Sequence, residues 1–551
     1  MGANLKKSFI IMKVIPLILM FFSFSFSMVF IKHNYYKLMN SDTSAEVLLG
    51  RLLNLEGGIF SKRWFYSTEI RVIDVQILYK FFYGLFSDNW LLIRMFTSGV
   101  MLILLVASYL IMMHALDLYN IGLYTAWILL LPFSQVYGYM IIYGVYYDRI
   151  LILTFLSVGL TLKISTSNVK PNNGILILFA FLNILSGFYG IRQAMVFYAP
   201  LIFTVLFEIY EKLKQKDSIS LKDLPEETIR FIKTSVSATI FYGIGYIINI
   251  IVISKILQYH GQSFTWEKFS LTRVLDSITL FVDAYGQYEF VSALRPFGIA
   301  SMLGIFSIGL MTISVISLFK NRNKLSGKLR LFTLFAIFDF AFTCFFGSFS
   351  FSMAPITYWI PVIPLFVPFW GLILKYNEYR LNQLIGKIAI LFVVAHIVLS
   401  ALCTYLHPND QRIPYCKDYS VYVDAAKFLK ESDYTQGFAT TWLSDLMTEM
   451  TAGKMEMWVV NNTETFTDNP QESIYEWLQV KDHKKVLPQD EFIVLTYNPE
   501  YAVANDMIGI EDFKYLAEQD ENLVYSDDYA RIYAFKNLEE LTSLYQKLEE
   551  R

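Results

Sequence analysis

Carboxylates that follow the first apolar segment are the residues of this chain with the clearest capacity for chemistry. Asp42 and Glu46 lie one helical turn apart in the segment 40–46, so a helix would place both side chains on one face. A carboxylate can take the proton of a reacting hydroxyl group, which makes Asp42 the candidate general base. The pair could also share a proton, hold a divalent metal ion or form a solvated face. A further alternative is that Ser41 or Asp42 caps the helix.

A third acid, Asp148, opens a later apolar segment and is followed directly by Arg149. A carboxylate at membrane depth is costly and marks a candidate functional site. Asp148 is therefore the second candidate for chemistry. The alternative is an ion pair between Asp148 and Arg149 at the level of the lipid headgroups.

Arginines beside the apolar segments are the candidate binders of an anionic group. Arg192 follows a glycine-rich hairpin, Arg94 opens one apolar segment and Arg295 precedes another. The planar guanidinium group suits bidentate contact with a phosphate, so we predict all three as phosphate contacts. Each could instead extend towards lipid headgroups.

The composition indicates which elements must position these residues. Of the 551 residues, 55% are hydrophobic and only 17% are charged, whereas soluble domains carry roughly 25% charged residues. Since about 20 apolar residues span a bilayer, the sequence predicts about 11 membrane-spanning helices. The predicted spans are 9–31, 91–113, 121–137, 148–164, 174–190, 194–210, 234–257, 298–319, 331–347, 357–374 and 388–406.

Lysine and arginine in the short loops predict the orientation. Lys6, Lys7 and Lys13 indicate a cytoplasmic N-terminus, and every second loop after it is again rich in Lys and Arg. An odd number of spans then predicts that the C-terminus lies outside. We expect a multi-pass protein of a plasma membrane, and the bias towards Lys, Ile, Asn, Tyr and Phe suggests a bacterial one.

The predicted outer segments are a first loop at 32–90, a later loop at 258–297 and a tail at 407–551. Apolar residues at helical spacing predict two interfacial helices in the first loop, around 45–55 and 70–85. In the tail, we expect strands at 437–440, 456–460, 492–496 and 529–535, and helices at 418–431, at 473–478 and at the C-terminal end. This alternation predicts a small α/β domain at 407–551, separate from a membrane domain at 1–406.

Several partners find no support in the sequence. The formal net charge of −2, without any basic stretch interleaved with aromatic residues, gives no reason to expect a nucleic acid. The histidines form no zinc spacing, and the tail has no glycine-rich phosphate loop. Metal dependence therefore stays open.

The arrangement over roughly residues 9–405 resembles the GT-C superfamily of membrane glycosyltransferases, such as the protein O-mannosyltransferases and lipid A aminoarabinose transferases. The resemblance rests on Asp42 in a long first outer loop, on the start 90–94 of the second span, on Asp148 at the fourth span and on the aromatic and proline residues of 358–364. The chain departs from the family pattern at 67–70, where a basic-Pro-Pro stretch is common.

The resemblance implies an α-helical polytopic membrane enzyme with a large first outer loop and a small extracytoplasmic α/β domain. It implies a polyprenyl-phosphate-linked sugar as donor and a hydroxyl group of a glycan, a lipid or a protein as acceptor. By the same resemblance, Asp42 would be the base, Asp148 a supporting acid and Arg192 a phosphate contact. Two other functions remain open: a lipid or small-molecule transporter or flippase, whose path would include Asp339 in mid-span, and a polysaccharide polymerase or ligase.

Overall fold

The computed structural model of the protein consists mainly of helices and divides into two compact units. One unit contains residues 1–33, 98–252 and 263–413, and the other contains 34–97, 253–262 and 414–551. The structure describes residues 2–549 except 68–72, 88, 168, 170, 216–223, 260–267, 289–294, 350–355, 376–382, 411–415, 461–468, 499–512 and 518. We call the first the membrane unit and the second the outer unit, after the predicted location of its loops, and describe each by itself.

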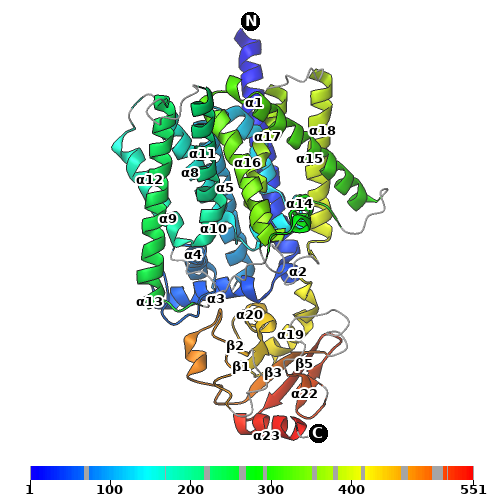
Figure 1. Ribbon diagram of the computed structural model, residues 1–551. Coiled ribbons are helices and arrows are strands. Elements are labelled where there is room, and N and C mark those ends of the chain that lie inside the picture. Colours follow the sequence, from blue (N-terminus) through cyan, green and yellow to red (C-terminus); the bar gives the residue numbers. More distant parts are fainter. Residues whose placement is uncertain are drawn as a thin grey trace. The chain divides into compact units, whose positions relative to one another are not determined.

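Within the described part of the chain, eight of the predicted spans are helices that are long and apolar enough to cross a bilayer. They are α1 (Gly2–His33), α5 (Trp90–Ala115), α8 (Asp148–Thr166), α10 to α11 (Ile191–Gln215), α12 to α13 (Glu226–Ile256), α15 (Pro296–Lys320), α16 (Gly327–Phe349) and α18 (Gln383–Leu406) (Figure 1). The protein is therefore a multi-pass membrane protein.

The other three predicted spans are short or broken. The span predicted at 121–137 is a pair of helical segments, Tyr119–Leu130 and Gln135–Tyr143, bent by 84°. Pro132 lies at the break, where it removes a backbone donor. The remaining two, α9 (Asn173–Phe188) and α17 (Ile363–Lys375), are apolar helices below the length of a full span.

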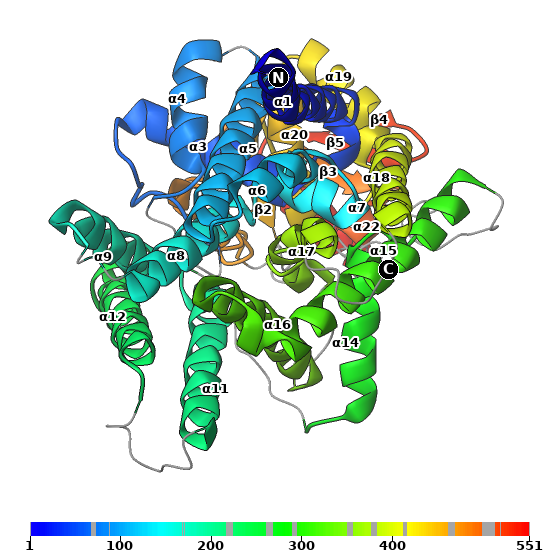
Figure 2. The same ribbon diagram turned by 90° about the horizontal axis from the view of Figure 1, so that it is seen from above.

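Close helix packing in the membrane unit depends on small residues. Helices α9 and α12 (Glu226–Ile248) lie side by side in both views (Figures 1 and 2). A Cβ atom added at Gly245 would lie 2.0 Å from the backbone oxygen of Ile184, and one at Gly187 would lie 2.3 Å from that of Tyr242. The two backbones are thus in contact, which is how small residues bring membrane helices together.

The remaining helices of the membrane unit are short, apart from α14. The amphipathic helix α14 (Leu271–Ala284) packs on α16 and belongs to the later outer loop. The short elements are α6 (Tyr119–Thr125), η1 (Ala126–Leu130), α7 (Gln135–Tyr137), η2 (Gly138–Tyr143), η5 (Asn249–Ile253), η6 (Arg322–Lys324) and η7 (Ile356–Trp359). The span Ile191–Gln215 begins with the short elements α10 (Ile191–Gln193) and η3 (Ala194–Tyr198), which precede α11 (Ala199–Gln215).

The outer unit combines the first outer loop with the C-terminal segment. Its sheet has the strand order β2-β1-β3-β5-β4, with β1 parallel to β2 and β3, and β5 antiparallel to β3 and β4. The strands are β1 (Gln436–Thr440), β2 (Glu456–Val460), β3 (Phe492–Tyr497), β4 (Leu523–Ser526) and β5 (Ala530–Phe535). The four strands predicted from alternating apolar residues are confirmed, whereas the half-exposed β4 was not predicted.

The helices of the outer unit come from both parts of the sequence. The first loop supplies α2 (Tyr35–Leu38), α3 (Ser41–Glu56) and α4 (Gln76–Phe86), and α13 (Ser254–Ile256) lies in the segment 253–262. The C-terminal segment supplies η8 (Tyr419–Tyr422), α19 (Val423–Glu431), α20 (Thr441–Met450), η9 (Lys481–Lys484), α22 (Lys514–Ala517) and α23 (Leu538–Glu549). The helix predicted at 473–478 is wrong, because Ile474 pairs with Val460 in an isolated bridge within turns.

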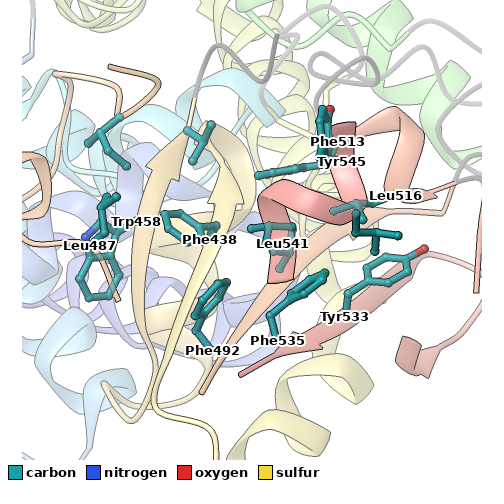
Figure 3. Packing of buried hydrophobic residues seen from close by; sticks show 14 residues of the cluster. Phe438, Trp458, Leu487, Phe492, Phe513, Leu516, Tyr533, Phe535, Leu541 and Tyr545 are labelled. Atoms are coloured by element: carbon teal, nitrogen blue, oxygen red, sulfur yellow. The ribbon is translucent and has the colours of Figure 1, made fainter. Parts of the chain in front are cut away.

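An aromatic core holds the sheet of the outer unit together (Figure 3). Phe438, Phe492 and Phe535 stand on neighbouring strands. The rings of Phe438 and Phe492 meet edge to face, and Phe492 stacks on Phe535. Leu541 and Tyr545 of α23 belong to the same core. Burial of such side chains contributes roughly 1.5–3 kcal/mol each. This core fixes β1, and therefore the start of α20, which follows β1 directly.

The first outer loop is joined to the C-terminal segment by backbone hydrogen bonds. The amide of Phe65 donates to the carbonyl of Gln479 at 2.9 Å, and the amide of Leu478 donates to the carbonyl of Phe65 at 2.8 Å. The amide of Tyr66 donates to the carbonyl of Gln258 at 3.0 Å. Three segments that are distant in sequence thus form one folded unit around α3.

Candidate active site

The first turn of α3 carries Asp42, and Asn40 is the residue that caps this helix. The Asn40 side chain accepts a hydrogen bond from the amide of Thr43 at 2.9 Å, and the Asn40 amide donates to the Thr43 hydroxyl at 3.0 Å. This reciprocal capping box provides hydrogen-bond acceptors for amides that have none within the helix. The alternative that Ser41 or Asp42 is the cap is therefore wrong. Asp42 is half-buried at the positive end of the helix dipole, which favours its charged form.

A buried ion pair ties this turn to α20. The Arg94 guanidinium donates to Glu449 Oε2 at 2.7 Å and to the Thr43 carbonyl at 3.2 Å. The Tyr35 hydroxyl donates to Glu449 Oε1 at 2.8 Å. Both charged side chains are 0% exposed. Arg94 therefore has a structural role inside the outer unit, and its contact with a phosphate stays a prediction.

Asp445 lies on α20 one turn before Glu449, on the helix face that packs against α3. It is buried, and burial raises the pKa of its carboxyl group well above the ordinary value, with further contributions from the negative charges of Asp42 and Glu449. The charged form of Asp445 is therefore disfavoured in the folded protein. Burial, and then the charge of Asp42, also raises the pKa of Tyr475.

A cleft of about 400 Å3 opens beside Asp445 within the outer unit. Its walls carry aromatic, amide and charged side chains: Arg51, Arg63, Trp64, Gln436, Lys454, Glu456, Gln479 and His483. His483 stacks on Trp458 and lies 3.0 Å from Glu456 Oε1, and this contact is the main cause of the lowered pKa of Glu456. A mixture of apolar walls and a few polar groups is typical of small-ligand sites.

Glu46 lies one turn after Asp42, as expected, and borders a separate small cavity of about 20 Å3 with Trp64 and Tyr66. Burial raises the pKa of Tyr66 to about 12, opposed by a hydrogen bond from the Ser61 amide and supported by the charges of Glu56 and Glu46. The two acids of α3 thus have different surroundings. The charge of Asp42 acts on the pKa of Asp445, whereas the charge of Glu46 acts on the pKa of Tyr66.

In the membrane unit, Asp148 and Arg192 belong to one cluster. Asp148 is the first residue of α8 and is 0% exposed. The Arg149 guanidinium lies 5.4 Å from the ring centroid of Tyr189, and the Arg192 guanidinium lies 5.7 Å from that of Tyr147. These two cation–π contacts fasten the start of α8 to the turn before α10. The roles of Asp148 and Arg192 in chemistry stay predictions.

Two further predicted residues stand apart from this cluster. Arg295 is exposed and directly precedes α15. Asp339 is buried in the middle of α16, and its carboxyl oxygens have no hydrogen-bond partner among the described residues.

Among the described residues, no group of three or more His, Cys, Asp or Glu side chains is placed to hold a metal ion.

The sequence did not single out the acids of α20. Asp445 and Glu449 lie four residues apart in an otherwise uncharged helix, and this spacing is a usable signal for a shared buried face. Their partners in α3 and α5 lie hundreds of residues earlier, so no local pattern could reveal them.

The comparison with solved structures shows the fold, whereas the other two comparisons found no match. No protein-family model and no curated protein matches the sequence. Among solved structures, ArnT from Cupriavidus metallidurans bound to undecaprenyl phosphate is similar with a TM-score of 0.56 at 11% identity, covering 96% of this chain and 98% of that one. Its apo structure gives a TM-score of 0.55 at 11% identity over 98% and 99%. The oligosaccharyltransferase AglB from Archaeoglobus fulgidus gives 0.48 at 11% identity over 92% and 72%.

Fold and spans together define the class of this protein. It is a multi-pass helical membrane protein in which a helical membrane unit is combined with an outer unit that contains a small sheet. The particular fold is similar to that of ArnT over nearly the whole of both chains, so the resemblance seen in the sequence is confirmed at the level of the fold.

Proposed function

We propose that this protein is an integral membrane glycosyltransferase that moves a sugar from a polyprenyl-phosphate carrier to an acceptor hydroxyl group on the outer face of the membrane. The observation that carries the proposal is the likeness to ArnT over nearly the whole of both chains. The ArnT structure contains undecaprenyl phosphate, which supports a lipid phosphate as the carrier in this chain as well.

In the proposed reaction, Asp42 is the general base. The acceptor O–H bond breaks as its proton passes to the Asp42 carboxylate, and the freed oxygen forms a bond with the anomeric carbon of the sugar. The bond between that carbon and the phosphate oxygen breaks, and the lipid phosphate leaves with the electron pair. We expect inversion at the anomeric carbon because the acceptor displaces the phosphate directly.

The position of Asp42 supports this role. The side chain is half-buried rather than fully solvated, and its helix is capped independently by Asn40. The position at the first turn of the helix places the carboxylate at the positive end of the helix dipole. The proposed phosphate contacts are Arg192, Arg94 and Arg295. The proposed further catalytic acids are Asp148 and Glu46. Dependence on a divalent metal ion is left open.

The test is a donor panel. The purified protein in lipid nanodiscs is incubated with sugars on polyprenyl monophosphate and on polyprenyl diphosphate, and the products are analysed by mass spectrometry. Transfer of a single sugar from the monophosphate supports the proposal. Transfer of a glycan from the diphosphate would indicate a polymerase or ligase, and lipid translocation in vesicles without sugar transfer would indicate a flippase.

A further inference from the structure

The cleft of about 400 Å3 in the outer unit is bordered by residues of α3, α20 and β2 and by the segments around them. We propose that this cleft binds a neutral sugar residue of the acceptor. The inference rests on the proposed function, because it narrows the acceptor from a glycan, a lipid or a protein to a carbohydrate. It also gives the cleft a role that is separate from the reacting groups.

The cleft lies on a different face of α3 from the proposed base. Four residues of this helix border it at the spacing of one helical face: Leu48, Arg51, Leu52 and Leu55. Asp42 precedes Arg51 by nine residues, which is about two and a half helical turns, and therefore lies on the opposite face. A ligand in the cleft is thus a part of the acceptor that does not react.

Arg51 brings hydrogen-bond donors to the cleft. Its Nη1 donates to the carbonyl of Gly453 at 3.5 Å, and the half-buried side chain makes no other hydrogen bond or ion pair within the described part of the chain. Gly453 has a φ of 77°, and a Cβ atom added there would lie 2.6 Å from Arg51 Nη1. The turn after α20 therefore leaves room for the guanidinium group, whose remaining N–H donors are available to a ligand oxygen.

Glu456 brings an acceptor that is held in a fixed position. Its Oε1 lies 3.0 Å from His483 Nε2, and this hydrogen bond is the main reason why the pKa of Glu456 lies below its ordinary value. The His483 ring in turn stacks on Trp458, and its Nδ1 lies 2.9 Å from Gln479 Oε1. The Glu456 side chain is 62% exposed, and its Oε2 has no hydrogen-bond partner among the described residues. This oxygen can accept a hydrogen bond from a ligand hydroxyl group.

A second carboxyl group borders the cleft from α20. Asp445 is only 5% exposed, and among the described residues it has neither a hydrogen-bond partner nor an ion-pair partner. A buried polar group without a partner costs free energy, which a ligand hydroxyl group in the cleft would recover. A hydroxyl group both donates and accepts, so it can pair with the charged and with the neutral form of this acid.

The other charged side chains at the cleft already have partners. Arg63 Nε donates to Asp482 Oδ2 at 2.8 Å, and Lys454 donates to two backbone carbonyls at 3.0 and 3.1 Å. The hydrogen-bonding capacity that is left belongs to one arginine and two acids. An anionic ligand would meet the acids and an amine would meet Arg51, whereas neutral hydroxyl groups can pair with both.

The apolar walls of the cleft suit the C–H groups of a sugar ring. Leu52, Trp64 and Met457 lie beside the polar groups, and such a mixture is typical of small-ligand sites. The volume of about 400 Å3 is near the lower end of the roughly 300–1,000 Å3 of such sites, which suits one or two sugar residues. A lipid chain would leave Arg51 and Asp445 without hydrogen-bond partners.

The experiment measures binding without any transfer. The full-length protein in nanodiscs is studied by saturation-transfer NMR with neutral hexoses, pentoses, N-acetylhexosamines and their disaccharides, and with glucuronate and glucosamine as charged probes. We expect a neutral sugar to bind, and Arg51→Gln and Asp445→Asn each to weaken its binding by about 10-fold or more, since each removes a hydrogen-bonding group of the cleft. The exposed Asp490→Asn, outside the cleft, is the control and should bind as wild type does.

Melting temperatures show which variants are folded, and Arg51→Gln decides the test if Asp445→Asn is not. Three results would overturn the inference: no binding of any neutral sugar, binding of the charged probes alone, or unchanged binding in the folded cleft variants. Sugar transfer without such binding would contradict this inference and leave the proposed function intact. Sugar binding that depends on Arg51, without transfer from any donor, would contradict the proposed function and leave the sugar site standing.

Discussion

Arg94 Nη2 lies 2.7 Å from Glu449 Oε2, and neither side chain is exposed to solvent. This ion pair joins the first turn of a predicted span to a helix of the C-terminal segment, inside one unit. Because it also involves the Thr43 carbonyl, it determines where the first turn of α3 stands.

Removing one partner of this pair should destabilise the protein strongly. We expect Glu449→Leu or Arg94→Met to lower the free energy of unfolding by about 3–5 kcal/mol, because each leaves a buried charge unpaired. The double variant should be less destabilised than either single variant. Denaturant unfolding of the full chain in detergent measures this. The pair of half-buried Arg230 with exposed Glu226 is the control, for which we expect a change of about 0.5 kcal/mol.

The Asn40 cap gives a second prediction. Asn40→Ala should cost about 1 kcal/mol of stability because the Thr43 amide loses its partner, and Asn40→Ser should restore most of it. The side chain of Asn172 caps α9 in the same way. Asn172→Ala should therefore lower the melting temperature to a similar extent while sugar transfer is retained. If Asn40→Ala and Asn172→Ala lost sugar transfer equally, the loss would come from lower stability and not from a displaced Asp42.

Asp445 should make stability depend on pH. Its pKa is raised in the folded state, so its contribution is fully present below the unfolded value of about 3.9 and is lost as pH rises towards the folded value. Asp445→Asn removes this dependence. The melting temperature of the variant, relative to wild type, should thus increase from pH 4 to pH 7. A difference that stays constant over this range would contradict the protonated state.

Helix contact in the membrane unit provides a test that is independent of the site. Gly245→Ala should destabilise the contact of α9 with α12 by about 1–3 kcal/mol, because the new methyl group meets the backbone of Ile184. Gly243 lies on the same helix with nothing within 4 Å of an added Cβ atom. Gly243→Ala should therefore leave the melting temperature nearly unchanged, and equal effects of the two variants would rule out this packing.

Much of the fold could be predicted because its determinants are local. Eight spans follow from length and apolar composition, and four strands follow from alternation of apolar residues. The failures have physical causes as well. Proline breaks the span predicted at 121–137, and the segment 473–478 forms a bridge to β2 where its local pattern favours a helix. The sequence predicts Ser41 or Asp42 as the cap of α3, one or two positions after the actual cap Asn40. All three residue types are equally suitable as caps, so residue type alone cannot choose among them.

The candidate site was predictable only in part. Asp42 and Glu46 are recognisable as acids at the start of a helix after the first span. Their surroundings depend on contacts between distant segments, since Arg94 and Glu449 are separated by 355 residues. No periodicity or motif in a single sequence reports such a pair. For the same reason, the joining of the first outer loop to the C-terminal segment could not be inferred from either segment alone.

The central claim is that Asp42 is the base of a glycosyl transfer, and the most direct measurement is the transfer rate of Asp42→Asn. The variant and the Asp490→Asn control are purified in nanodiscs and supplied with the donor that wild type uses. We predict that Asp42→Asn loses transfer by about 100-fold or more while its melting temperature and donor binding stay close to those of wild type. A correctly folded Asp42→Asn protein that transfers sugar at the wild-type rate would contradict the account.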